Sequence, residues 1–329
     1  MKPNLLPYLG RFILLHLVIY YLVSFAFLAF QGALPQAYRT ALDLYEPFRP
    51  PGVGSDIGQF LRGLAFALVF YPFYNTVFRG ARGKLILFSS MWGVALFGSV
   101  EPQPGSIEGI IYTTISFWEH TYVLIAVGVQ MMLFVWLFFK WERYVRKKKQ
   151  DTATAPEITP SGNSGKTEYF ESLFPAPHKI KGYTIRFTIV HLVTYWVIGS
   201  IFYEFAGYRE ALETLEIFEL WRPLETIPTV LLVIFGQIFR AVFLALFLYP
   251  FYNDYIIRIQ GWWLLFWLLF GLTALGSPIF LPEFILFEGT FAQFFMEMLV
   301  GIPEIFTQML IFSVIFFLWQ KKHERKAVS

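Results

Sequence analysis

The stretch GQFLRGLAFALVFYPFYN at residues 58–75 returns as GQIFRAVFLALFLYPFYN at residues 236–253. Both copies begin with Gly-Gln, carry an arginine three residues after the glutamine, and end an apolar run with Tyr-Pro-Phe-Tyr-Asn. The same polar residues at the same spacing in two apolar runs indicate a tandem duplication. We interpret the Tyr-Pro-Phe-Tyr-Asn motif as a structural feature that ends the helix, since proline removes a backbone hydrogen-bond donor and tyrosine is favoured at the membrane interface.

Four shorter matches follow the same order along the chain. They are Arg11-Phe12 with His16 and Tyr20 against Arg186-Phe187 with His191 and Tyr195, residues 46–50 against 219–223, Gly98-Ser99 against Gly276-Ser277, and Glu108-Gly109 against Glu288-Gly289. Because these matches keep their order and nearly their spacing, the duplication extends over most of the chain. It predicts a first repeat at 1–146, a linker at 147–180 and a second repeat at 181–329.

The composition is typical of an integral membrane protein. Of the 329 residues 56% are hydrophobic and only 15% are charged, which is too little charge for the surface of a soluble domain of this size. Several apolar runs approach the length of about 20 residues that a helix needs to cross a bilayer. Only helices fit, because these runs do not alternate in polarity. The predicted spans are 12–30, 60–78, 85–100, 122–139, 187–205, 230–252, 262–280 and 299–318.

The distribution of charge predicts the orientation of these spans. On an eight-span model most of the 26 basic residues fall on one side and most of the 23 acidic residues on the other. The basic side is expected to face the cytoplasm, which puts both termini inside a cytoplasmic (inner) membrane. Four spans in each half make the repeats parallel, related by a pseudo-twofold axis along the membrane normal. The predicted fold is therefore an all-α, polytopic membrane protein built from two tandem four-helix repeats.

Several segments between the spans have their own character. Residues 150–178, rich in Thr, Ser, Pro and Gly, read as a disordered cytoplasmic linker, and the basic run at 143–149 before it is expected to touch anionic lipid. Residues 206–220 have the pattern of an amphipathic surface helix. Residues 107–120 and 283–298 are apolar but too short and interrupted to span, so they are re-entrant or interfacial.

Two arginines need an explanation first. Arg62 and Arg240 lie a few residues inside predicted spans, where an unpaired charge costs several kcal/mol. The structural interpretation is an internal salt bridge that holds a short outer segment to the second helix of each half. The functional interpretation is an anion or lipid-headgroup site, since guanidinium binds carboxylate and phosphate in fork geometry. The candidate substrate-binding residues are Arg62, Arg240, Gln59, Gln237, Glu108, Glu288, Glu119, Glu297, Arg49 and Arg222.

Two histidines come next. His16 and His191 each have a tyrosine four residues later, Tyr20 and Tyr195, so each pair shares one helix face. The simplest interpretation is a hydrogen-bonded histidine that helps helices pack. A second is a proton-handling group in a transporter. A third is a pair of axial ligands that meet across the pseudo-twofold axis and hold a b-type haem.

Some chemistry is disfavoured by the sequence. The chain has no cysteine, and it contains no nucleotide-binding, hydrolase or metal-ligand motif. The net charge of +3 gives no support for nucleic-acid binding. We therefore predict no metal and no cofactor, with haem b as the alternative, and we expect membrane lipid as a partner. A homo-oligomer or a protein partner remains open.

The leading functional prediction is a non-enzymatic transporter or channel-like protein for a small anionic or amphiphilic solute. Its site would lie between the repeats and face outward, because duplication places two equivalent sets of buried charges around one axis. The first alternative is a membrane assembly module that binds a lipid or a partner and transports nothing. The second alternative is an intramembrane enzyme or a haem protein.

Overall fold

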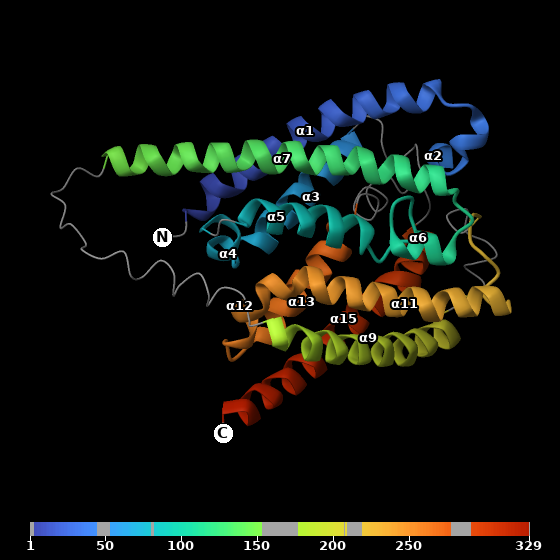
Figure 1. Cartoon of the computed structure of the whole chain (residues 1–329). Helices are drawn as coiled ribbons and strands as arrows, with labels where there is room; N and C mark the ends of the chain where they lie inside the picture. The colour runs from blue at the N-terminus through green and yellow to red at the C-terminus, as the bar shows by residue number, and fades with distance from the viewer. Residues whose placement is uncertain are drawn as a thin grey trace.

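The computed structural model describes residues 3–44, 53–79, 82–152, 177–206, 208, 219–277 and 291–328. These residues are almost entirely helical, and in them the only extended pairing is an isolated bridge between Thr113 and Trp221. The prediction of an all-α fold is therefore confirmed. In Figure 1 both ends of the chain lie at the same end of the molecule.

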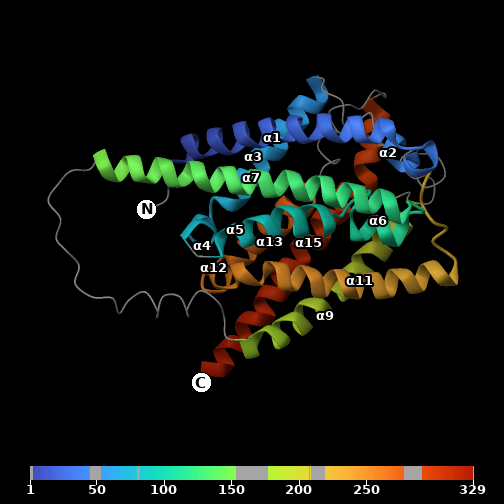
Figure 2. The same cartoon turned by 45° about the horizontal axis from the view of Figure 1, so that its top comes forward.

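The first half is built on three long helices. α1 (Leu5–Ala33) packs against α3 (Val53–Phe70) and α7 (Phe117–Thr152). A shorter helical run packs against α7, formed by α4 (Tyr74–Arg79), α5 (Gly83–Phe88) and the π-helical η3 (Ser89–Phe97). Three short elements lie at the end of the molecule far from the termini (Figure 2). They are η1 (Gln36–Tyr38), α2 (Thr40–Leu44) and α6 (Ile107–Tyr112).

The second half has a comparable set of helices. α9 (Pro177–Phe205) packs against α11 (Ile227–Leu248) and α15 (Phe291–Val328). α13 (Gly261–Thr273) packs against α15 and follows the short elements η5 (Tyr249–Phe251) and α12 (Tyr252–Ile256).

Five of the described helices are long and apolar enough to cross a membrane. They are Leu5–Ala33, Phe117–Lys147, Lys179–Phe205, Ile227–Ile256 and Gly301–Arg325. Two shorter apolar helices, Gly83–Phe97 and Gly261–Thr273, overlap the predicted spans at 85–100 and 262–280 in part. The predicted span at 60–78 is divided, because α3 ends at Phe70 just before Pro72. Large apolar side chains such as Leu14, Val18 and Leu22 are exposed along α1, as expected where lipid is the solvent.

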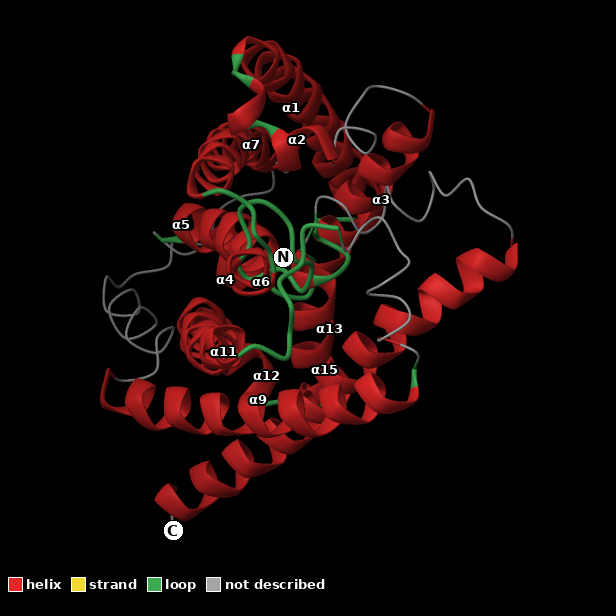
Figure 3. Ribbon diagram, turned by 90° about the vertical axis from the view of Figure 1, so that its right-hand side faces the viewer, coloured by secondary structure: helices red, strands yellow, loops and turns green. Residues whose placement is uncertain are grey.

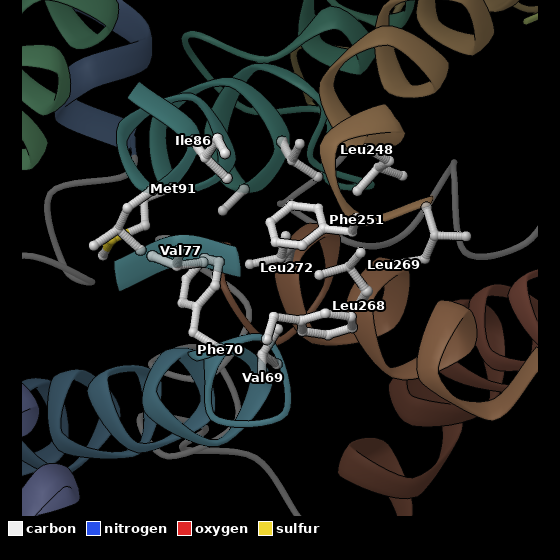
Figure 4. Packing of buried hydrophobic residues seen from close by; sticks show 14 of the residues in the cluster. Val69, Phe70, Val77, Ile86, Met91, Leu248, Phe251, Leu268, Leu269 and Leu272 are labelled. Atoms are coloured by element: carbon white, nitrogen blue, oxygen red, sulfur yellow. The ribbon is translucent and has the colours of Figure 1, made fainter. Parts of the chain in front are cut away.

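The halves meet in one continuous apolar core. α3 of the first half packs against α13 of the second, and η3 packs against α11 and α13. Phe73 and Phe251, the aromatic residues after proline in the two Tyr-Pro-Phe-Tyr-Asn motifs, face each other with ring centroids 5.0 Å apart. Figure 4 shows Phe251 among Val69, Phe70, Leu268 and Leu272 at this junction.

The second tyrosine of each repeated motif ties the end of its helix to the last helix of the same half. The hydroxyl of Tyr74 donates to Glu142 Oε2 over 2.7 Å, and that of Tyr252 donates to Glu324 Oε1 over 2.8 Å. An arginine on the first helix of each half joins its cluster. Arg11 Nε donates to Glu142 Oε1 over 2.7 Å, and Arg186 Nε donates to Oε1 of Gln320, whose Nε2 donates to the Tyr252 hydroxyl. These contacts give the motif the architectural role that its sequence suggests.

Candidate functional site

A buried ion pair joins the two halves at Arg240. Its Nη1 lies 2.8 Å from Oε1 of Glu108, and both side chains are almost fully buried. Gln237, one turn earlier on α11, donates from Nε2 to both oxygens of the same carboxylate over 3.1 Å. Glu108 belongs to α6 of the first half, so the pair is made between segments far apart in the sequence. For Arg240, this pair is the kind of internal salt bridge that the structural interpretation expects.

Further hydrogen bonds extend this cluster to α9 and η3. Nη2 of Arg240 donates to the carbonyl oxygens of Gly98 (3.2 Å) and Ser99 (3.4 Å), which lie at the end of η3. A ring nitrogen of His191 lies 3.3 Å from Oε1 of Gln237. The hydroxyl of Tyr195 contacts that of Tyr112 on α6. The cluster therefore holds four elements together.

The loop before α6 determines where Glu108 lies. Ser106 caps α6 by accepting a hydrogen bond from the Gly109 backbone N–H over 2.8 Å. A Cβ on Gly109 would lie only 2.2 Å from the carbonyl oxygen of Gln103, so this close approach needs glycine. Burial raises the pKa of the Glu108 carboxyl, while Arg240 and Gln237 lower it. Figure 3 looks onto this end of the molecule, where loops surround α6.

Arg62 occupies the matching position on α3 but has fewer partners. Its Nε donates to the carbonyl oxygen of Gly276 over 2.8 Å, and its guanidinium lies 5.3 Å from the ring centroid of Phe66. Arg62 takes part in none of the ion pairs among the described residues, and Glu101 acts on it only at longer range. The side chain is only 2% exposed. The structure thus holds a buried cation without a salt bridge in its described part.

Several buried atoms have no hydrogen bond within ordinary geometric limits among the described residues. Three of them are Nη2 of Arg62, Oε1 of Gln59 and Nε2 of His16, and Nε of Arg240 is another. The side chains of His16 and Gln59 lie within reach of each other. The side chains of Arg62, Gln59 and His16 are at most 2% exposed. Gly63 leaves room for the imidazole, since a Cβ there would lie 3.0 Å from His16 Cδ2. His191 and Gln237 contact each other in the second half in the same way, so the His–Gln pair is common to both halves. The halves differ in the partners of their arginines.

The other predicted site residues fall into three groups. Glu119 accepts hydrogen bonds from the backbone N–H groups of Ala41 (2.6 Å) and Leu42 (3.2 Å), so it caps α2. Arg222 contributes its backbone N–H to the Tyr112 carbonyl over 2.7 Å. Arg49, Glu288 and the side chain of Glu297 lie outside the described residues.

The histidines and their tyrosines lie in the interior. His16 packs edge-on against Phe66 and Phe134, whereas His191 stacks on Tyr195. Tyr20 is buried on α1 near the guanidinium of Arg62. The described ring contacts of each histidine come from its own half, so they give no support to ligation of one haem by both.

Sequence reasoning missed several members of the site. The Gly98 and Gly276 carbonyls were not foreseen as acceptors, because backbone groups leave no residue-type signal. Glu304 was also missed, although an acidic residue directly after Pro303 in an apolar run is the kind of signal that marks an intramembrane site. In the described part of the chain no group of three His, Asp or Glu residues is placed to hold a metal ion.

No family model, curated protein or solved structure matches this chain.

Proposed function

We propose that this protein is a transporter for a small anionic or amphiphilic solute, whose anionic group binds at Arg62. The observation that carries the proposal is the buried guanidinium of Arg62, whose Nη2 has no hydrogen bond and which takes part in none of the ion pairs among the described residues. His16 and Gln59 lie near this guanidinium as further polar groups. Buried polar groups are normally satisfied, and each exception calls for an explanation. A carboxylate or phosphate would accept from Arg62 and from the His16 and Gln59 N–H groups once the amide and the imidazole tautomer are set accordingly.

The comparison of the two arginines supports the choice of Arg62. Arg240 already has Glu108 as its counter-charge, at 2.8 Å. Arg62 has a backbone carbonyl and an aromatic face, which do not neutralise a full charge. A guanidinium kept unpaired in a low-dielectric interior costs several kcal/mol, and a bound anion removes that cost. The second-half cluster then serves as the structural counterpart of a binding site in the first half.

The proposed architecture is the one the sequence predicts. It has eight spans in two parallel four-helix repeats, a pseudo-twofold axis along the membrane normal, and both termini in the cytoplasm. Reciprocal contacts support the axis, since Arg62 donates to Gly276 and Arg240 donates to Gly98. Phe73 contacts its own repeat equivalent, Phe251, as residues beside a twofold axis do.

Glycine contacts between the halves support the same arrangement. A Cβ on Gly271 would lie 2.2 Å from a methyl of Val69, and one on Gly93 would lie 2.6 Å from the ring of Phe247. In the sequence alignment of the repeats Gly93 corresponds to Gly271 and Val69 to Phe247. The same close approach is thus made twice with the halves exchanged. A solute path between the halves would run along this axis.

Binding and stability in Arg62 variants test the proposal. Octanoate and inorganic phosphate serve as probes, with binding followed by calorimetry on protein in mild detergent and flux followed in liposomes. We expect Arg62→Gln to lose binding of the accepted probe while keeping or gaining thermal stability, because it removes an unpaired buried charge. Arg240→Gln is the matched control and should lose stability, because it leaves the buried carboxylate of Glu108 without its counter-charge. An Arg62→Gln variant that binds the probe as the parent does overturns the proposal.

Glu288→Gln tests the competing explanation that Arg62 has an internal partner. We expect this variant to keep probe binding. If Arg62→Gln and Glu288→Gln each destabilise the protein and the double variant is no less stable than either, the two residues are coupled and the anion site is wrong. Binding of the probe without flux in liposomes would instead favour the binding or assembly module over the transporter.

A further inference from the structure

A second ionisable group lies inside the second half without a charged partner. Glu304 is a half-buried residue on α15, one position after Pro303. The hydroxyl of Tyr208 donates to its Oε2. Gly199 on α9 leaves space for the carboxylate, since a Cβ there would lie 3.3 Å from Oε1. No described ion pair includes Glu304.

The groups that face Glu304 are acids and tyrosines. Glu108 on α6 acts on it electrostatically, and Glu304 acts in turn on Tyr112. On the α9 side, Tyr203 lies with its ring centroid 6.3 Å from that of Tyr208. The remaining helix beside this part of α15 is α13, whose sequence GWWLLFWLLFGLT has no ionisable residue.

The nearest cation of the cluster is already engaged. Arg240 is the counter-charge of Glu108, together with Gln237. With both carboxylates ionised, the cluster around Arg240, which includes Glu108 from the first half, carries two negative charges against one positive charge. Arg62, in the first half, is a positive charge without a described ion pair, and the residue that matches Glu304 there is Ala126. The two unpaired charges therefore have opposite signs and lie in opposite halves.

We propose that Glu304 is a proton-binding site and that its proton is taken up together with the anion at Arg62. This inference rests on the proposed function. In the step, one O–H bond forms on the Glu304 carboxylate with a proton from water, and nothing is oxidised or reduced. The phenol of Tyr208 can donate to the carboxylate and accept from the carboxylic acid, so its contact survives both states. Anion and proton together leave the interior without a net change of charge, which is favourable in a low-dielectric medium.

Proton uptake on anion binding tests this. The full-length protein in weakly buffered detergent solution is mixed with octanoate or phosphate, and a pH-indicator dye reports the protons taken up. We expect about one proton per bound anion for the parent protein. Glu304→Gln should still bind the probe but take up no proton. Glu324→Gln, whose carboxylate pairs with Lys179 at 3.0 Å at the opposite end of α15, is the control and should behave as the parent.

The outcomes separate the two proposals. Anion binding without proton uptake in the parent, or equal uptake in Glu304→Gln, overturns the role of Glu304 and leaves the anion site standing. Absence of anion binding in the parent overturns the proposed function. In that case an infrared titration tests Glu304 independently of the anion. The carboxylic acid band that changes with pH in the parent should be missing from Glu304→Gln, and an unchanged band in this variant contradicts a proton-binding role for Glu304. If Glu304→Gln does not fold, Glu304→Asp keeps the titratable group and should keep proton uptake with a shifted midpoint.

Discussion

At the scale of single residues, the same side chain has two different environments. Arg240 is neutralised by Glu108 and caps the end of η3, whereas Arg62 reaches one carbonyl oxygen and an aromatic face. Both sites are buried, so the difference lies in the partners and not in access to water. This contrast is why we propose a structural role for Arg240 and a binding role for Arg62.

Removal of the Glu108 charge should be severely destabilising. Glu108→Gln keeps the size of the side chain but leaves Arg240 as an uncompensated buried charge, which costs about 3–5 kcal/mol. The double variant Glu108→Gln with Arg240→Gln should recover much of that loss. Reversible unfolding in mixed micelles measures both, and a double variant as unstable as the sum of the single ones would contradict the ion pair.

Replacement of Glu119 should affect one short helix and not solute binding. Its carboxylate accepts from two backbone N–H groups of α2, so Glu119→Ala leaves these buried donors unsatisfied at a cost of about 1–3 kcal/mol. We expect lower thermal stability with unchanged affinity for the probe that Arg62 binds. If the variant lost binding but kept its stability, Glu119 would belong to the solute-binding site, contrary to this prediction.

At the scale of elements, glycines determine how closely the helices of the two halves approach. Gly271 on α13 lets α3 come within contact of its backbone, and Gly93 on η3 does the same for α11. Small residues are common at such crossings, because in lipid the helices associate through close packing and not through the hydrophobic effect. The glycines thus explain why two short apolar helices can occupy the centre of the molecule.

Substitution of Gly271 should separate α3 from α13. Gly271→Val places new methyl groups where Val69 already lies, and such overpacking costs about 1–3 kcal/mol. Val69→Ala in the same chain should restore part of the stability, while Val69→Ala alone lowers it. Melting temperatures of the three variants in one detergent test this, and a Gly271→Val protein that Val69→Ala makes still less stable would contradict the contact.

At the scale of the whole molecule, the halves form one structure. They share the apolar core and exchange hydrogen bonds at Arg62, Arg240 and the Thr113–Trp221 bridge. The residues that make these contacts all lie outside the segment 153–176. The association of the halves should therefore survive a break in that segment.

Cleavage of the chain between the halves tests this. A protease site inserted at residue 160 should give two fragments that stay together in mild detergent during gel filtration, because the interface buries polar and apolar contacts from both. The uncut protein is the control for elution volume. Separation of the fragments without denaturant would mean that each half folds independently and that no site lies between them.

The sequence determined the class of the protein and much of its internal order. Hydropathy and low charge sufficed to predict an all-helical fold with helices long and apolar enough to cross a membrane, because a bilayer admits few backbone structures. The repeat also identified Arg62, Arg240, Gln59 and Gln237 as the polar residues to explain. The division of the span at 60–78 could not be placed in advance, because proline marks a break without setting its geometry.

Only the tertiary structure decided which polar residue meets which. The sequence made Arg62 and Arg240 equivalent, yet only Arg240 has a described carboxylate partner, and that partner comes from the other half. The carbonyl acceptors at Gly98 and Gly276 and the environment of Glu304 likewise depend on how helices cross. Spacing along the chain fixes neighbours on one helix face, but contacts between helices depend on packing that local sequence does not encode.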